Sequence, residues 1–154
     1  MTDASLTMRP AREADLASIV EMLADDELGA SRETPSPPVN DCYRAAFAEI
    51  DADPNQFLCV VEDGQRIVGT LQLTFIPGLS RKGTKRGQIE AVRIASDRRG
   101  SELGKSMFAW AISECRSRGC SLVQLTTDKS RPDAHRFYDR LGFEPTHIGY
   151  KLKI

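Results

Sequence analysis

A chain of 154 residues with 40% hydrophobic and 28% charged residues has the composition of a soluble globular protein, and its length predicts one domain covering residues 1–154. The formal net charge of −1 provides no overall positive field, so we expect neither nucleic acid nor a membrane surface as a partner. No apolar run approaches membrane-spanning length, and residues 1–7 lack the features of a secretory leader, which predicts a cytoplasmic protein.

Hydrophobic periodicity and turn residues predict an alternating series of strands and helices. In chain order the predicted elements are strand 6–9, helix 15–24, helix 43–50, strand 57–62, strand 67–76, strand 88–94, helix 103–118, strand 122–126, helix 133–140 and strand 149–153. The Asp63-Gly64 pair predicts a hairpin turn, and residues 29–38 are expected to form a loop. This order predicts a mixed α/β sheet flanked by helices, in which the unit from 88 to 127 is a right-handed parallel crossover.

The cysteines predict no metal site. Cys42, Cys59, Cys115 and Cys120 form no Cys-x-x-Cys pair, and the two histidines are not spaced with them as zinc ligands. Cys59 lies in an apolar run, where a buried free thiol is the expected state.

The most informative stretch is residues 98–105, Arg-Arg-Gly-Ser-Glu-Leu-Gly-Lys, which lies between the apolar run 89–94 and the longest predicted helix. Backbone N–H groups at a helix start are unpaired, and the helix dipole there favours negative charge. Arg98 and Arg99 add positive charge and forked donors. The strand, the basic glycine-containing turn and the helix therefore predict a phosphate cradle for a phosphorylated cofactor.

The run from Ile89 into this helix resembles the acyl-CoA-binding core of the GCN5-related N-acetyltransferases (GNAT). Residues 134–143, Ala-His-Arg-Phe-Tyr-Asp-Arg-Leu-Gly-Phe, are similar to the family's helix that ends in Phe-Tyr and is followed by Leu-Gly-Phe. The resemblance implies a single-domain α/β (α+β) GNAT fold, with a mixed, mostly antiparallel sheet and a central parallel strand pair splayed for CoA. It also implies acetyl-CoA as co-substrate, no metal, and direct transfer of an acetyl group to a primary amine of a small molecule or peptide.

The resemblance assigns a cofactor role to residues of the strand and of the turn. These are Val92, Arg93 and Ile94 for the pantetheine arm, Arg99, Gly100, Ser101, Glu102, Leu103 and Gly104 for the pyrophosphate, Lys105 or Arg98 for the 3′-phosphate, and Ser130 for a role that many relatives give to an Asn. Glu102 replaces a family glycine, and its side chain restricts φ and repels phosphate unless it points outward. We expect weakened rather than abolished CoA binding.

Two residues are candidates for proton transfer. The resemblance makes Tyr138 a general acid for the departing thiolate, and the alternative is an aromatic side chain that only packs beside Phe137 and Phe143. Glu90 is the candidate general base for the attacking ammonium, and the alternative is a surface charge paired with Arg86. His135 is a second base by its ordinary pKa, although we interpret it as structural or exposed.

The acceptor is the least determined part. In such folds the acceptor groove is expected along the acidic run 25–27, the loop 32–41, Gln72, Phe75 and Tyr150. The acidic run either attracts a cationic amine or is a solvated helix end. A CoA-binding or sensing module without turnover and a nucleotide-binding module are the competing hypotheses, and the terminal strands make a homodimer plausible.

Overall fold

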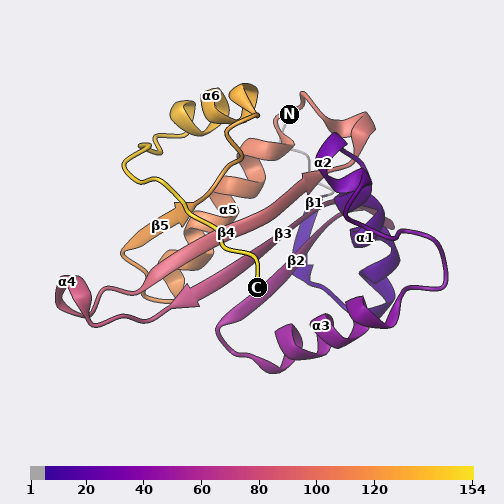
Figure 1. The fold of residues 1–154 in the computed structure, drawn as a ribbon, viewed down its shortest axis with the longest axis horizontal. Helices are drawn as coiled ribbons and strands as arrows, with labels where there is room; N and C mark the ends of the chain where they lie inside the picture. Colours follow the sequence, from indigo (N-terminus) through magenta and orange to yellow (C-terminus); the bar gives the residue numbers. More distant parts are fainter. Residues whose placement is uncertain (1–5) are drawn as a thin grey trace.

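The structure is a computed structural model that describes residues 6–154. Residues 1–5, which belong to the stretch assessed above for a secretory leader, lie outside the described range. Within that range a five-stranded sheet has the order β1-β2-β3-β4-β5, with antiparallel neighbours throughout except that β4 is parallel to β5 (Figure 1). The strands are β1 (Leu6–Pro10), β2 (Gln56–Asp63), β3 (Arg66–Ile76), β4 (Arg86–Ile94) and β5 (Leu122–Leu125). The predicted fold class, a mixed and mostly antiparallel sheet flanked by helices, is confirmed.

Helices cover both faces of this sheet. In the described range they are α1 (Leu16–Ala24), α2 (Glu27–Ala30), α3 (Asp41–Ala52), α4 (Ser80–Gly83), α5 (Leu103–Ser117) and α6 (Pro132–Arg140). The helices α5 and α6 lie on one face, and α1 and α3 lie on the other (Figure 1). The one-turn helices α2 and α4 are not predicted by the sequence, because a single turn leaves little periodicity to detect. No helix of residues 6–154 has the length and apolar character that crossing a bilayer requires.

The main core lies on the face that α5 covers. Leu71, Leu73 and Phe75 of β3 are at most 1% exposed and belong to one cluster with Met107 and Phe108 of α5. These residues follow the period of two of a strand and the 3.6-residue period of a helix, so each element turns one apolar side inward. We call this side of the sheet the α5 face.

Three of the four free cysteines also belong to the α5 face. Cys59, Cys115 and Cys120 are buried, whereas Cys42 is exposed on α3. Burial raises the pKa of Cys59 to about 12 and that of Cys115 to about 11, so both thiols stay protonated near neutral pH. A Cβ on Gly87 would lie 2.4 Å from Cys115 Sγ, so the glycine allows α5 to approach β4 closely. These cysteines are packing residues.

The opposite face is apolar only where α1 and α3 cover it. Ile19 and Phe47 from these helices cluster with Leu58 and Val60 of β2. Toward β4 and β5 the same face presents a row of polar side chains. This row, which we call the polar row, consists of Gln56, Gln72, Thr74, Gln88, Glu90 and Gln124.

A β-bulge in β4 separates the two halves of that strand. The pairing with β3 shifts so that both Ala91 and Val92 lie opposite Leu71, and Ala91 has a φ of 52°. The extra residue reverses the alternation, because Ile89 and Val92 both join the α5 face while Arg93 turns away from it. A left-handed alanine is strained by about 1–2 kcal/mol. Such strain is commonly found at functional sites.

The predicted final strand at 149–153 is wrong. Residues 144–154 form neither helix nor strand, so β5 is the edge of the described sheet and the parallel pair β4–β5 is not flanked on both sides. The alternation of apolar and polar residues is present, but no strand of residues 6–154 lies beside it. A strand pattern forms a strand only where a partner supplies hydrogen bonds.

Candidate active site

The strands β4 and β5 separate along their length. Their pairing ends at Ile89 opposite Leu125, whereas β4 continues for five residues to Ile94. One edge of β4 beyond Ile89 therefore has no strand beside it. Next to this opening, Thr127 Oγ1 is one of the few polar side-chain atoms of the described residues that are buried without a hydrogen-bond partner. A buried polar atom of this kind indicates a place where a ligand or water supplies the partner.

The turn at 99–104 brings backbone N–H groups to the end of that opening. Gly100 has a φ of 78°, which a glycine adopts without strain. Gly104 is buried in the first turn of α5, where a Cβ would lie 3.3 Å from Phe137 and 3.4 Å from Ile94. The N–H groups of this first turn have no intrahelical acceptor, and Leu103 donates to Ser101 Oγ instead. The turn is therefore a small anion-binding cradle at the N-terminus of a long helix.

Glu102 does not need to be glycine in this structure. Its φ of −71° is helical, and its side chain is 80% exposed with Oε2 lying 2.9 Å from Lys105 Nζ. The conformational cost expected from the sequence is therefore absent, and the carboxylate is directed toward Lys105 along the helix surface.

The basic side chains of the turn are paired with acidic residues. Arg98 contacts Asp63 of the β2–β3 hairpin, and Arg99 Nη2 donates to the carbonyl oxygen of Asp25 at 2.8 Å and to its carboxylate at 3.1 Å. Arg93 approaches Asp26, with 3.2 Å between Nε and Oδ2. Asp25 and Asp26 of the acidic run 25–27 therefore form ion pairs with the turn at 99–104 and with β4. Neither alternative drawn from the sequence included this role.

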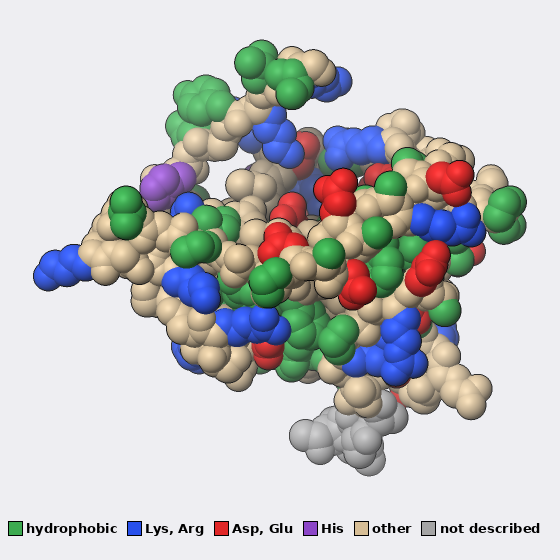
Figure 2. Space-filling view, turned by 90° about the horizontal axis from the view of Figure 1, so that it is seen from below, with side chains coloured by type: hydrophobic (Ala, Val, Ile, Leu, Met, Phe, Trp, Pro, Cys, Tyr) green, Lys and Arg blue, Asp and Glu red, His purple; other side chains and the backbone are tan. Residues whose placement is uncertain are grey.

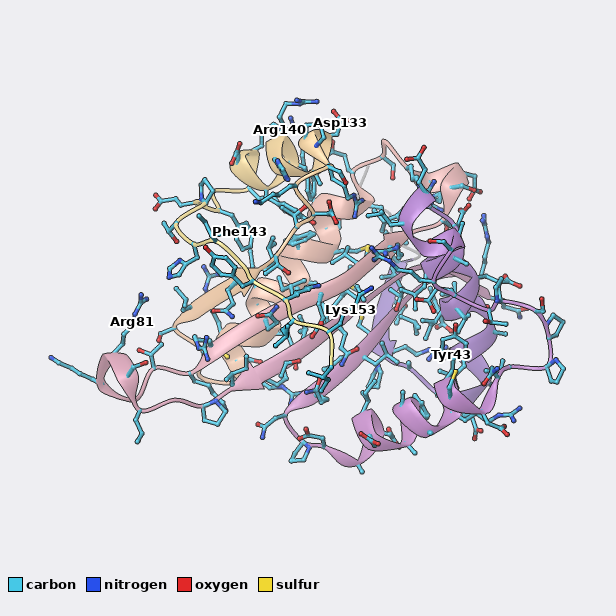
Figure 3. All side chains as sticks on the ribbon, in the orientation of Figure 1. Tyr43, Arg81, Asp133, Arg140, Phe143 and Lys153 are labelled. Carbon is cyan, nitrogen blue, oxygen red and sulfur yellow. The ribbon has the colours of Figure 1, made fainter. Side chains whose placement is uncertain are left out.

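Tyr138 lies in an aromatic cluster between α5 and α6. Its ring centroid is 5.7 Å from those of Phe108 and Phe137 and 6.2 Å from that of Phe143, which lies between α6 and the sheet (Figure 3). Burial raises the pKa of the Tyr138 phenol, so the group holds its proton at neutral pH. Tyr138 therefore packs beside Phe137 and Phe143, as the alternative interpretation predicted. This packing is compatible with proton donation by the phenol.

Glu90 lies on the opposite face, one residue before the bulge. Its Oε1 accepts a long hydrogen bond of 3.5 Å from Thr74, and Thr74 also donates to Gln56, which accepts from Gln72. The expected alternative partner, Arg86, donates to Gln124 instead at 3.3 Å. Glu90 is exposed, so its carboxylate is available to a molecule that occupies this face.

A pocket of about 140 Å³ opens beside Glu90. Its floor includes Gln72 and Ala91, and its walls are apolar residues of α1 and α3, among them Leu23 and Phe47. Gln72 therefore lines this pocket, and its place in the acceptor groove stays a prediction.

Phe75 does not reach this pocket, so its predicted place in the acceptor groove is wrong. Its side chain is 1% exposed on the α5 face, because residues 72 and 75 differ by an odd number and therefore point to opposite faces of β3. Tyr150 is 90% exposed and lies outside the described pockets.

The remaining candidates lie around the N-terminus of α6. Ser130 donates its backbone N–H and its hydroxyl to Asp128 Oδ1, at 2.9 and 2.6 Å, and is exposed. His135 Nε2 donates to the carbonyl oxygen of Asp128 at 2.9 Å, which supports its structural interpretation. Arg81, in the basic stretch before β4, lies at the far tip of the α4 loop (Figure 3). In the described range no cluster of His, Cys, Asp and Glu is suited to a metal ion.

Some features of the site have only faint sequence signals. The bulge could have been found from the spacing of Ile89, Val92 and Ile94, which fits one face only if a residue is inserted between them. The pairing of Asp25 and Asp26 with arginines joins residues far apart in the chain. Nothing in the sequence specifies that contact.

Comparisons with known proteins agree with this geometry. Residues 18–143 match the acetyltransferase (GNAT) family. The chain belongs to this family. A glucosamine 6-phosphate N-acetyltransferase of Trypanosoma brucei brucei is 33% identical over 159 aligned residues, which cover 100% of both chains. An aminoalkylphosphonate N-acetyltransferase of Salmonella typhimurium is 32% identical over 108 residues, or 70% of each chain.

Among solved structures, a Bacillus halodurans C-125 protein described as a transcriptional regulator is 48% identical, with a TM-score of 0.93 over 97% of this chain and 99% of the other. The members of the GNAT family are acyltransferases, so this GNAT chain is an acyltransferase.

Proposed function

We propose that this GNAT chain is an acetyl-CoA-dependent N-acetyltransferase that acetylates the primary amine of a small polar molecule by direct attack. The observation that carries the proposal is the separation of β4 from β5 beyond Ile89, which leads to a glycine-containing turn at the N-terminus of α5. In this proposal residues 1–154 act as one catalytic domain.

The residues present fit a CoA thioester. The free edge of β4 at Val92, Arg93 and Ile94 suits an extended pantetheine arm that carries amide groups, because such an arm can pair like a strand. The N–H groups from Gly100 to Gly104 suit the pyrophosphate. Arg98, Arg99 and Lys105 lie around the same turn, and the exposed ion pairs of Arg99 and Lys105 are weak enough to exchange for phosphate contacts. Bound acetyl-CoA supplies an activated acetyl group as a thioester.

In this proposal two side chains on opposite faces of the sheet transfer protons. Glu90 accepts a proton from the acceptor ammonium, directly or through water, and leaves a neutral amine whose lone pair forms the new C–N bond. The nitrogen loses its second proton to solvent after attack. As the C–S bond breaks, Tyr138 donates its phenolic proton, which it regains from solvent, or a hydrogen bond to the departing sulfur. The raised pKa of Tyr138 supports this direction of transfer, because the phenol is protonated before the reaction.

The acceptor we infer is a small amine that also carries a phosphate or phosphonate group. The polar row suits a hydrophilic molecule, and Arg86 at the start of β4 offers a cation on the same face. Two relatives are named for acceptors of this kind, an aminoalkylphosphonate and glucosamine 6-phosphate. In this proposal Ser130 keeps its predicted cofactor contact, and the loop 32–41 keeps its predicted place along the acceptor groove.

The test combines binding with turnover. Thermal unfolding is measured with acetyl-CoA, CoA and ATP, and thiol release is then measured with 2-aminoethylphosphonate, glucosamine 6-phosphate, their phosphorus-free analogues and a peptide amine. We expect stabilisation by both CoA species and thiol release with a phosphorylated amine. A ligand at about 100 times its Kd adds ~2.7 kcal/mol to the free energy of unfolding. Absence of any stabilisation by CoA species contradicts the proposal.

Variants separate chemistry from binding. Glu90→Gln and Tyr138→Phe are each expected to lower kcat by about 10²–10⁴-fold while acetyl-CoA binding persists. Glu49→Gln, an exposed carboxylate of α3, is the matched control and should leave kcat unchanged. Acetyl-CoA binding without thiol release for any amine, together with no effect of Tyr138→Phe, would instead support the CoA-binding module.

A further inference from the structure

The face that carries the polar row also holds a half-buried arginine without an acidic partner. Among the residues that the structure describes, Arg86 makes one side-chain hydrogen bond, a long one of 3.3 Å to Gln124 Oε1, and no ion pair. Arg93 of β4 and Arg99 of the turn are, by contrast, both paired with carboxylates. A guanidinium has five donors in a fork that matches phosphate oxygens. An anionic group of a ligand would therefore complete the hydrogen bonding of Arg86.

Arg86 and the proposed base Glu90 lie at the two ends of one side of β4. Gly87 and Ile89 between them pack on the α5 face, so residues 86, 88 and 90 share the opposite face. With a rise of about 3.3 Å per residue, Arg86 and Glu90 are about 13 Å apart along the strand. Figure 2 shows that the molecule is hollowed between the body and the C-terminal segment, which passes in front of this face in Figure 1. A cation and an anion therefore mark the two ends of an accessible surface.

Amide and hydroxyl groups line the surface between these two charges. Thr74 of β3 and Gln124 of β5 lie directly opposite Gln88. Gln124 Nε2 donates to Gln88 Oε1 at 2.7 Å, and Thr74 donates to Gln56 at 3.0 Å. Within residues 6–154 the amide nitrogen of Gln88 makes no side-chain hydrogen bond, so its N–H donors remain available. Amides and hydroxyls both donate and accept, and the hydroxyl groups of a sugar ring need partners of this kind.

We propose that the acceptor is a hexosamine phosphate that lies along β4, with its amine at Glu90, its ring hydroxyls at Gln88 and its phosphate at Arg86. This inference rests on the proposed function, because it gives the proposed acceptor a sugar ring and a fixed orientation. A hexosamine 6-phosphate presents amine, hydroxyls and phosphate in the same order as these side chains. The reverse orientation places the phosphate against the carboxylate of Glu90 and the ammonium against Arg86, so charge selects one orientation.

The distance between the two charges discriminates among acceptors. A short aminoalkylphosphonate spans only part of the distance of about 13 Å between Glu90 and Arg86, and it has no hydroxyl group for Gln88. One of its ends therefore lacks a charged partner. An unphosphorylated amino sugar reaches Glu90 and Gln88 but leaves Arg86 without an anion. A site with polar groups at fixed positions rejects analogues that leave those groups unpaired, so it selects the molecule that carries all of them.

Titration calorimetry on the full chain, with and without saturating CoA, tests the acceptor without turnover. The probes are glucosamine 6-phosphate, glucosamine, glucose 6-phosphate and 2-aminoethylphosphonate. In wild type we expect glucosamine 6-phosphate to bind about 10–100-fold more tightly than glucosamine or 2-aminoethylphosphonate, because only this probe meets both charges and the amides. Glucose 6-phosphate, which lacks the amine, should bind more weakly than glucosamine 6-phosphate.

Variants then assign the phosphate to Arg86. Arg86→Gln should weaken glucosamine 6-phosphate by about 10–100-fold and leave glucosamine unchanged. Arg86→Lys should keep part of the preference, because it retains the charge and loses the fork. Gln88→Leu should weaken both amino sugars and leave 2-aminoethylphosphonate unchanged. Arg81→Gln, at the far tip of the α4 loop, is the matched control and should bind every probe as wild type does (Figure 3).

The outcomes separate this inference from the proposed function. Equal weakening of glucosamine and glucosamine 6-phosphate by Arg86→Gln overturns the inference, and so does a wild type that binds 2-aminoethylphosphonate as tightly as glucosamine 6-phosphate. Thiol release with other amines, together with no binding of the hexosamine phosphate, retains the proposed function and overturns the inference. Binding of glucosamine 6-phosphate that depends on Arg86 but gives no thiol release supports the assigned ligand and contradicts the proposed turnover.

Discussion

The two faces of the sheet are built for different purposes, although the same strands form both. On the α5 face, Leu73 and Ile89 are at most 1% exposed and lie within the main core. On the opposite face, their neighbours Gln72 and Glu90 lie in the polar row. Because successive side chains of a strand point to opposite faces, core packing and the proposed acceptor contacts fall on alternate residues. Mutations one position apart should therefore separate the two.

The largest contrast is expected between Leu73→Ala and Gln72→Ala. Leu73 is completely buried, so its truncation should lower the free energy of unfolding by about 2–5 kcal/mol. Gln72 is only partly buried, so its truncation should change that free energy by about 0.5 kcal/mol or less while raising KM for the acceptor. Urea unfolding and steady-state kinetics measure the two effects. Equal destabilisation by both variants would show that the polar row is part of the core.

Arg9 is the exception that sharpens this comparison, because it is polar and structural. Its guanidinium bonds to Asp15 at 2.7 Å and to Glu62 at 2.6 Å, with the side chains of Arg9 and Asp15 only 16% and 11% exposed. Arg9→Met leaves the Asp15 carboxylate without its cation. We therefore expect the free energy of unfolding, measured with urea at pH 7, to fall by about 1–3 kcal/mol. Arg44→Met, which removes a more exposed arginine, is the control and should cost about 0.5 kcal/mol or less.

The same variant should change the response to acid. The hydrogen bond from Arg9 lowers the pKa of Asp15 below its ordinary value. A lowered native pKa stabilises the fold above the unfolded pKa of about 4, and this contribution is lost as the pH falls through the native pKa. Wild type should therefore lose more stability than Arg9→Met between pH 5 and pH 3. A steeper acid loss in Arg9→Met would contradict this assignment.

The smallest effects are expected in the cofactor turn. Gly100→Ala should lower the free energy of unfolding by about 1–2 kcal/mol, because the φ of Gly100 is positive. A Cβ at this position would meet no atom within 4 Å, so no steric clash adds to this cost. Glu102→Gly should change the Kd for acetyl-CoA by about threefold or less, since its carboxylate is exposed and directed to Lys105. Urea unfolding measures the first effect, and titration calorimetry with acetyl-CoA measures the second. Tenfold tighter binding by Glu102→Gly would mean that the carboxylate repels the pyrophosphate, as the sequence suggested.

The sequence by itself determined most of the fold and the place of the glycine-containing turn before α5. Period-two and period-3.6 patterns locate β1 to β5 and the long helices, and glycine spacing locates the turn at 99–104, because these signals are local. The resemblance carried by residues 134–143 identified the family that the comparisons confirm. The roles of Glu90 and Tyr138 stay predictions.

Only the tertiary structure decided which residues meet. It turned Phe75 into the core, paired Asp25 and Asp26 with arginines of the turn and of β4, and left residues 149–153 without a strand. Each outcome depends on register or on contacts between distant segments, and local patterns do not encode these. The alternation in residues 148–154 shows this limit, because the pattern predicts a strand while no strand of residues 6–154 lies beside it.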